Sequence, residues 1–381
     1  MHLIWATDDF KLNGVSYVGF PILLEEDLTS AAYANEFLRW YLTRGVIASK
    51  QSWPSTGRAL YDYFSFLEAH ELNWREPRVG DQPSSISAYR DYSKDVINLA
   101  SDTIRQRVLY VCEFYEYALA QSWINALPFD YEERRGSGSS RYLAHLNASG
   151  NVTKTRDVMP KARRHLPQFL STSQAKALIT AARNIHHRMV IRTALHTGMR
   201  REELATFPMA YVFDPIAAGR SERNIRIRLD PNDGNGMRTK GNKARDVYLS
   251  AVFLQELAVY CNQHRGERAR LSDDPQSPVF LNDRGQPYAA SGKQIQRIVA
   301  TTARLAGFRA WPHMLRHTYA THTLHRLQDK RSLIDPLVFL MNQLGHESIE
   351  TTMTYLHLVR GRADDAVLAY DDELNTWMDE G

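Results

Sequence analysis

The chain has 381 residues, of which 43% are apolar and 24% charged, with a formal net charge of +4, and this length and composition predict a globular protein with two domains. No apolar run approaches the ~18 residues of a membrane span, and two cysteines are too few for a disulfide framework or a cysteine-based zinc site. The N-terminus contains acidic residues and lacks the basic segment of a signal peptide, so a cytoplasmic protein without a membrane partner is expected.

Residues 1–20 are expected to form a short N-terminal extension, and residues 21–130 an all-helical domain. In this domain apolar and aromatic residues recur at helical spacing after polar start signals. The pattern is clearest from Ile104 onward, where the apolar positions form one stripe. The aromatic residues are expected to pack in the core. Helices are expected to begin near Thr29 and near Ser55, and to cover 87–99 and 101–121.

Residues 131–165 lose the apolar periodicity and gain Gly, Ser and basic residues, which is typical of an interdomain linker. Its cations could lie along a phosphate backbone, or they could belong to a solvated tether. The sequence alone leaves both possibilities open. These cations are Lys154, Arg156, Lys161, Arg163 and Arg164.

Residues 166–381 are expected to form a mainly helical domain with a small antiparallel β-sheet. The alternation of apolar and charged residues over 224–230 and the short apolar segment 246–249 predict two strands, because the residues between them favour turns. Helical patterns surround this insertion. They cover 172–182, 185–196, 250–263, 291–306, 313–326 and 336–344.

Charge is distributed unevenly along the chain. Residues 1–150 carry 14 Lys or Arg against 19 Asp or Glu, residues 151–360 carry 32 against 17, and residues 361–381 carry 1 against 7. A basic central segment between acidic ends is expected of a surface that holds a polyanion, although a solvated basic face without a ligand would have the same composition.

Four separated stretches concentrate residues that bind phosphate or act as nucleophiles: LHTGMRREEL (195–204), RTKGNKARDVYL (238–249), PHMLRHTYATH (312–322) and LGHESIETTMTYLH (344–357). In order and spacing they resemble the tyrosine recombinase, or phage integrase, family. The resemblance is strong over 171–360 and looser for the N-terminal helices, which are similar to the family's core-binding domain. It implies a helical core-binding domain followed by a mixed α/β catalytic domain.

The resemblance implies that Arg200 and Arg316 bind one DNA phosphate. Cleavage of a phosphodiester without a metal needs other cations on the non-bridging oxygens, and the planar guanidinium group suits this best. The neighbouring Arg201 is the competitor, but the T-G-hydrophobic-Arg pattern favours Arg200. Glu203 lies three residues on, on the same helical face, and is expected to orient Arg200 or to pair with it.

Two histidines complete the phosphate site by resemblance. His313 is expected to be an acid–base or phosphate-binding group, and His346 to donate a hydrogen bond to a non-bridging oxygen. His317, four residues after His313, could form a zinc pair with it, but no third ligand or H-E-x-x-H glutamate follows. His317 is therefore expected to be structural, and the site to need no metal or other cofactor.

The resemblance assigns the remaining chemistry to a lysine and a tyrosine. Lys240, rather than Lys243, is expected to protonate the departing 5′ oxygen from a β-hairpin, although the preceding PNDGNG departs from the family's usual strand. By resemblance, Tyr355 is expected to attack the phosphorus through its hydroxyl and form a 3′-phosphotyrosine. This role would explain why Tyr355 lies off any apolar stripe. A free tyrosine has a pKa of about 10, so its hydroxyl is almost entirely un-ionised at pH 7. The nearby cations are expected to offset the cost of ionising it.

The expected activity is site-specific recombination of double-stranded DNA by a homotetramer, with a monomer possible in free solution and accessory proteins possible. A type IB topoisomerase-like or resolvase activity would use the same residues, and a DNA-binding regulator with an inactive site is a third hypothesis.

The acidic residues 361–381 include apolar positions that predict a tail helix. This helix is expected to dock on a neighbouring protomer or on its own domain.

Overall fold

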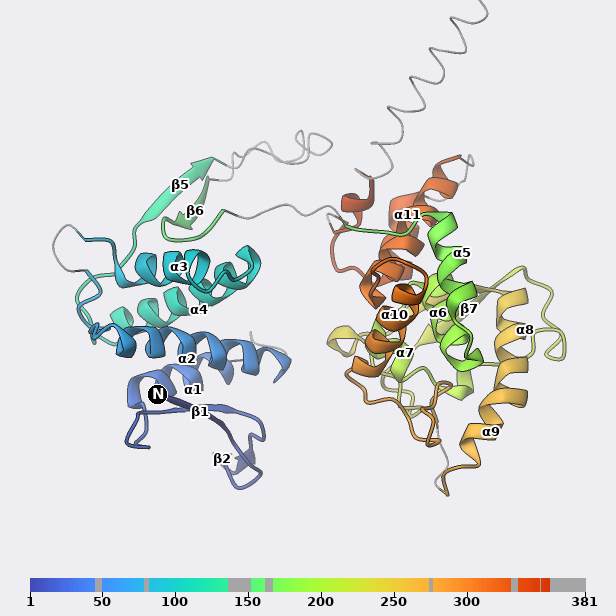
Figure 1. Cartoon of the computed structure of the whole chain (residues 1–381), viewed down its shortest axis with the longest axis horizontal. Coiled ribbons are helices and arrows are strands. Elements are labelled where there is room, and N and C mark those ends of the chain that lie inside the picture. Colours follow the sequence, from blue (N-terminus) through green and yellow to red (C-terminus); the bar gives the residue numbers. More distant parts are fainter. Residues whose placement is uncertain are drawn as a thin grey trace, which may run out of the picture. The chain divides into compact units, whose positions relative to one another are not determined.

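The computed structural model describes residues 1–44, 50–78, 82–135, 152–161, 167–273, 277–329, 335–349 and 351–356. The chain divides into two compact units, Met1–Arg164 and His165–Gly381, which are distinct in Figure 1. Each unit buries its own hydrophobic core. The expected tail helix over 361–381 lies outside the described residues.

Four helices form the body of the first unit, as the periodicity predicted. The stripe on the last of them is buried from Ile104 to Tyr115, and Tyr63 and Phe114 in the core are fully covered. The expectation that the aromatic residues pack rather than react is therefore confirmed for these positions. The helices are α1 (Ala32–Leu42), α2 (Trp53–Ala69), α3 (Ser85–Asp95) and α4 (Ser101–Ala120), with a 3-10 turn at Lys50–Ser52 before α2.

The first unit also contains strands that the sequence did not predict, so it is mainly helical rather than all-helical. Strand β1 (His2–Trp5) pairs antiparallel with β4 (Pro21–Leu24), and β2 (Lys11–Leu12) pairs with β3 (Val15–Ser16). The Asn35 side chain joins β4 to α1, because it accepts a hydrogen bond from the Leu23 N–H at 2.8 Å and donates one to the Leu23 carbonyl at 2.7 Å. Residues 1–20 are thus part of the folded unit.

Part of the expected linker is a β-hairpin. Strand β5 (Tyr131–Arg135) pairs antiparallel with β6 (Val152–Arg156), within the segment 131–165 that the composition predicts to be an interdomain linker. The hairpin is held on α4 because Arg156 pairs with Glu113 at 2.7 Å and with Glu116 at 2.6 Å. Arg156 is therefore engaged within the unit rather than along a phosphate backbone. Arg163 and Arg164 lie outside the described residues.

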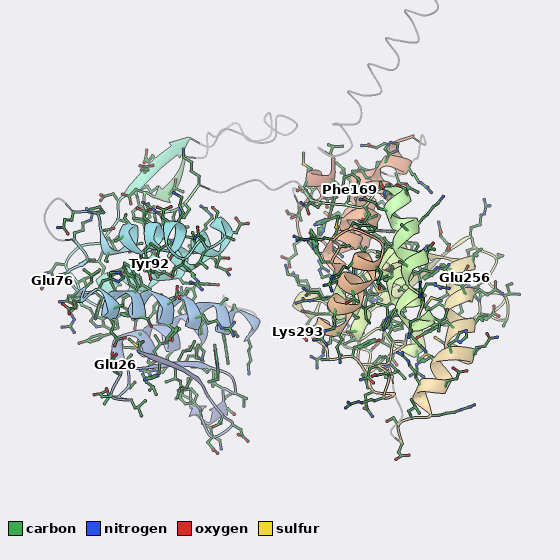
Figure 2. The ribbon with its side chains drawn as sticks, in the orientation of Figure 1. Glu26, Glu76, Tyr92, Phe169, Glu256 and Lys293 are labelled. Carbon is green, nitrogen blue, oxygen red and sulfur yellow. The ribbon has the colours of Figure 1, made fainter. Side chains whose placement is uncertain are left out.

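The second unit is mainly helical, with its core between α6, α11 and the elements around them. Glu256 of α8, labelled in Figure 2, pairs with Arg192 of α6. The helices are α5 (Thr172–Ala181), α6 (Ile185–Thr197), α7 (Arg201–Ala205), α8 (Ala251–Tyr260), α9 (Gly266–Ala269), α10 (Lys293–Leu305), α11 (Pro312–Asp329) and α12 (Pro336–Leu344), with a 3-10 turn at Met209–Tyr211, a π turn at Cys261–Arg265 and helical residues at 351–356.

The expected β insertion is present. Strand β7 (Asn224–Leu229) pairs antiparallel with β8 (Arg245–Ser250), with Ile225 opposite Leu249 and Ile227 opposite Val247. Alternate residues of β7 are buried, which fits a strand with one face on a core. A 3-10 turn at Lys240–Asn242 lies in the connection between the two strands. The prediction of a mainly helical fold with a small antiparallel sheet is confirmed.

None of the helices in the described parts of the chain combines the length and the apolar composition needed to span a membrane. Cys112 and Cys261 are both buried free thiols, and burial raises the pKa of each to about 12.

Candidate active site

Two glycines shape the backbone around the candidate site. Gly198 ends α6 with a φ of 64°, and Gly345 ends α12 with a φ of 63°, a left-handed conformation that favours glycine. A Cβ atom at Gly198 would lie 2.6 Å from Cδ1 of Tyr319, and one at Gly345 would lie 2.5 Å from Cδ of Arg245. Both turns therefore need glycine for conformation and for space.

The carbonyl groups at these turns hold the two predicted arginines. Arg316 of α11 is 1% exposed, and it donates to the carbonyls of Gly198 at 2.7 Å and of Leu344 at 2.5 Å. Arg200, at the start of α7, donates to the Gly345 carbonyl at 3.0 Å. The segments that contain the two arginines, far apart in the sequence, thus meet at the ends of α6 and α12.

Burial, with a smaller effect from Arg200, lowers the pKa of Arg316 to about 9. The guanidinium is therefore still protonated at pH 7. Its Nε atom is buried and makes no hydrogen bond within the described part of the chain. Arg316 thus keeps its charge and one unpaired donor in a buried position, which is costly unless an anion binds nearby.

Glu203 joins Arg200 to a second buried arginine that the sequence analysis did not identify. The carboxylate accepts from the Arg200 backbone N–H at 2.7 Å and from its guanidinium at 3.1 Å. It also accepts from Arg245 at 2.6 Å and 3.3 Å. Burial alone would raise the pKa of Glu203, but Arg245, Arg200 and Arg316 together lower it, so Glu203 is an anion between cations.

Arg245 itself is 8% exposed and ties the β-hairpin to α12. It begins β8 and donates to the Gln343 carbonyl, and the Gln343 side chain accepts from the backbone N–H of Tyr248 at 2.9 Å. The only hint in the sequence was the Arg that follows Lys-Gly-Asn-Lys. A surface arginine would have given the same pattern, so the sequence could not reveal that it is buried.

A cavity of about 890 Å³ opens beside these groups, and its lining includes Arg200, Lys240, Lys243 and His346 as well as apolar residues of α12. Lys240 is exposed on the 3-10 turn. Lys243 pairs with Glu347 at 2.7 Å, which connects the turn with the loop after α12. The structure thus brings the predicted lysine to the same cavity as Arg200, whereas its competitor is already paired.

The predicted histidines lie on two different elements. His346 shares a hydrogen bond of 2.9 Å between its Nδ1 and the Thr352 hydroxyl. Burial, followed by Arg316 and Arg200, lowers the pKa of His346 to about 3, and the same causes in the same order lower the pKa of His313. Both rings are therefore neutral at pH 7.

Tyr355 is buried, in contrast to the expectation that it lies off any apolar stripe. It is 2% exposed and packs in a small cluster with Leu324 and Leu340. Its hydroxyl is hydrogen-bonded to Nδ1 of His317 at 2.8 Å. Burial raises the pKa of Tyr355, and Arg316 and Arg200 offset this only in part. The nearby cations therefore do not lower the pKa of Tyr355 below that of a free tyrosine in the protein without DNA.

His317 is thus in contact with the expected nucleophile, although the sequence analysis assigned it a structural place. Its ring centroid lies 4.3 Å from that of His313. The stacked rings of His346 and Tyr355 have centroids 6.1 Å apart. Among the described residues, no group of three or more His, Cys, Asp or Glu is placed to hold a metal ion.

Buried arginines, neutral histidines and a tyrosine from separate elements thus gather at one place beside a cavity. A site that combines anion-binding cations with a hydroxyl nucleophile is typical of phosphoryl transfer enzymes. The family model described as the phage integrase family matches residues 168–362. The chain belongs to this family.

Individual relatives agree with this assignment. The chain is 28% identical over 303 residues to the tyrosine recombinase XerC of Roseiflexus sp. (strain RS-1), covering 72% of this chain and 88% of the relative. It is 24% identical over 307 residues to XerC of Bacillus subtilis (strain 168), covering 79% and 83%. The crystal structure of the XerH site-specific recombinase bound to palindromic difH substrate has the same fold, with a TM-score of 0.58, 16% identity and coverage of 91% and 92%.

Proposed function

We propose that this chain is a site-specific DNA recombinase that breaks and rejoins DNA strands through a 3′-phosphotyrosyl link at Tyr355. The observation that carries this proposal is the convergence of Arg200 and Arg316 on the glycine turns that end α6 and α12, beside the tyrosine. Two fixed cations at one place suit a phosphodiester, whose developing negative charge they stabilise.

In this proposal Arg200 and Arg316 bind the non-bridging oxygens of the scissile phosphate. Both guanidinium groups are already oriented by backbone carbonyls, so little reorganisation is needed when DNA binds. His346 and His313 complete the site as neutral donors, since burial and the arginines keep their pKa values low. Glu203 and Arg245 position Arg200 without contacting the substrate.

Lys240 is the proposed general acid for the 5′ oxygen. It is exposed at the mouth of the cavity that Arg200 lines, and the departing alkoxide needs a proton. The Lys243–Glu347 pair lies in the same turn region and leaves Lys240 as the lysine available to the substrate. This supports the choice of Lys240 over Lys243.

Tyr355 attacks the phosphorus, and the covalent link conserves the energy of the phosphodiester bond, so rejoining needs neither ATP nor a metal. The proposed partner is double-stranded DNA, and the structure of the Tn1549 transposon integrase, which has a similar fold, is a complex with transposon right end DNA. We further propose a homotetramer on two duplexes, a monomer in free solution, accessory recombination proteins, and a cytoplasmic, nucleoid-associated location.

A strand-exchange assay tests this function. Two labelled duplexes of different length, drawn from the DNA flanking the gene, are incubated with the protein in EDTA, and a supercoiled plasmid with the same DNA is incubated in parallel. Recombinant duplexes support the proposal. Relaxation of the plasmid without exchange would replace it with a topoisomerase-like activity, and binding without any strand breakage would replace it with a DNA-binding regulator.

A further inference from the structure

The Tyr355 hydroxyl must lose a proton when it attacks phosphorus, and the structure shows which group is placed to receive it. Within the described residues, the hydroxyl has one hydrogen-bond partner, Nδ1 of His317, at 2.8 Å. A proton acceptor must lie within hydrogen-bond distance of the group that it deprotonates. His317 meets this condition in the folded protein before any DNA is bound.

The other two histidines near the tyrosine are less well placed. His346 has its Nδ1 engaged with Thr352 at 2.9 Å, and its ring stacks beside that of Tyr355 with centroids 6.1 Å apart. His313 contacts His317 rather than Tyr355, with ring centroids 4.3 Å apart. His313 and His346 therefore remain available to bind the phosphate, while His317 contacts the tyrosine.

We propose that His317 is a catalytic residue that accepts the Tyr355 proton at Nδ1 as the tyrosine attacks the DNA phosphate. This inference rests on the proposed function. In the step, the Tyr355 Oη–H bond breaks and the proton passes to Nδ1, while the released electron pair forms the bond from Oη to phosphorus. The bond from phosphorus to the 5′ oxygen breaks, and that oxygen takes a proton from Lys240. Rejoining reverses each transfer, and no atom changes its oxidation state.

The charges around His317 explain why this transfer is coupled to DNA. Burial, with His313 and Arg316 of the same helix, lowers the pKa of His317 to about 4. A neutral ring with its proton on Nε2 leaves the Nδ1 lone pair free to accept, but such a ring is a weak base. Among the described residues, the groups that face this region from the other elements are Arg200, His346 and Tyr355 itself. The carboxylate of the same cluster, Glu203, is already paired with Arg200 and Arg245.

The incoming phosphate supplies a negative charge that is not already paired with an arginine. An anion near a histidine favours its protonated form and raises its pKa. The same phosphate offsets the positive field of Arg316, which otherwise disfavours a charged His317. Proton transfer therefore becomes favourable only when the scissile phosphate is in place, and the tyrosine stays neutral in the free protein.

The test compares His317→Asn and His317→Ala with the wild type in the full chain. Asparagine keeps a polar atom near the position of Nδ1 but cannot take the proton. The control is His322→Asn on the same helix, since His322 is hydrogen-bonded to the Leu170 carbonyl at 2.9 Å, outside the catalytic cluster. The measurement is the single-turnover rate of covalent adduct formation on a nicked duplex between pH 6 and pH 9, with DNA affinity measured by gel shift.

We expect both His317 variants to bind DNA normally and to form the adduct about 10²- to 10³-fold more slowly at pH 7, the size of a lost general base. The deficit should shrink as the pH rises, because hydroxide replaces the base, and added imidazole should partly restore His317→Ala. Variant rates equal to or above that of the wild type would overturn the proposal, and so would a loss that is constant with pH and unaffected by imidazole. The proposed function stands in either case if Tyr355→Phe abolishes the wild-type adduct.

Discussion

Removal of the negative charge of Glu203 tests the buried network that positions Arg200. The change is Glu203→Gln, which preserves size and one carbonyl oxygen. The Glu203 side chain is 0% exposed, and its two oxygens accept four hydrogen bonds from Arg200 and Arg245. The amide replaces one acceptor with a donor, so two of these contacts become donor against donor.

The expected cost follows from burial. Removal of one partner of a buried ion pair costs about 3–5 kcal/mol, because the remaining charge is left uncompensated. Here Arg245 is buried and Arg200 half-buried, so we expect the second unit to lose a free energy of unfolding of about 3–5 kcal/mol at pH 7. The neighbouring Glu202→Gln is the matched control. Glu202 is half-buried in the first turn of α7, and removal of its charge is expected to cost no more than about 1 kcal/mol.

Hydrogen exchange of the full chain in increasing urea is the suitable assay, since it reports the stability of α6 and α11 separately from that of the first unit.

The stabilisation that Glu203 provides should depend on pH in a defined direction. The pKa of Glu203 is lowered on folding, so its stabilisation is fully present above the unfolded value of about 4.3 and is lost as the pH falls through the lower folded value. The deficit of Glu203→Gln should therefore shrink in acid. Equal stabilities of Glu203→Gln and Glu202→Gln at pH 7 would refute the reasoning.

Two further predictions concern the glycine turn and the lysine. Gly345→Ala should destabilise the second unit by more than Gly219→Ala. Both positions need a left-handed conformation, which costs alanine about 1–2 kcal/mol, but only the new Cβ atom at position 345 would collide with Arg245. Equal melting temperatures of the two variants would contradict this. Lys240→Ala should slow adduct formation by about 10²- to 10⁴-fold, and a bridging 5′ sulfur, which leaves without a proton, should restore the rate. Lys243→Ala should form the adduct without the help of the 5′ sulfur. If the sulfur accelerates Lys240→Ala and Lys243→Ala equally, Lys240 is not the general acid.

Local signals made much of the second unit predictable. Residues 336–344 were expected to be helical, and α12 has these bounds because Asp335 caps its first turn, Pro336 fits the first helical position and Gly345 adopts the left-handed conformation that ends it. Strand β7 was similarly marked by its alternation, and β8 by a short segment that follows turn residues. Each of these signals involves residues that are close together in the sequence, so it can be recognised without knowledge of the fold.

Contacts between distant segments could not be predicted in the same way. Strand β4 pairs with β1 across the first 24 residues, and nothing local to either segment specifies the other. The burial of Arg245 depends on Glu203 and Gln343 from two other elements. The contact between His317 and Tyr355 depends on how α11 packs against residues 351–356. The sequence therefore indicated which residues form the candidate site, but not that its proposed nucleophile is buried and hydrogen-bonded to a histidine.

A covalent-trapping assay in EDTA tests directly whether Tyr355 forms the covalent link to DNA. Wild type and Tyr355→Phe are incubated with nicked duplexes drawn from the DNA flanking the gene, and the products are separated on a denaturing gel. We predict a protein–DNA adduct with the wild type and none with Tyr355→Phe, while both bind the DNA in a gel shift. An adduct that persists in Tyr355→Phe would contradict the account, because another residue would then be the nucleophile.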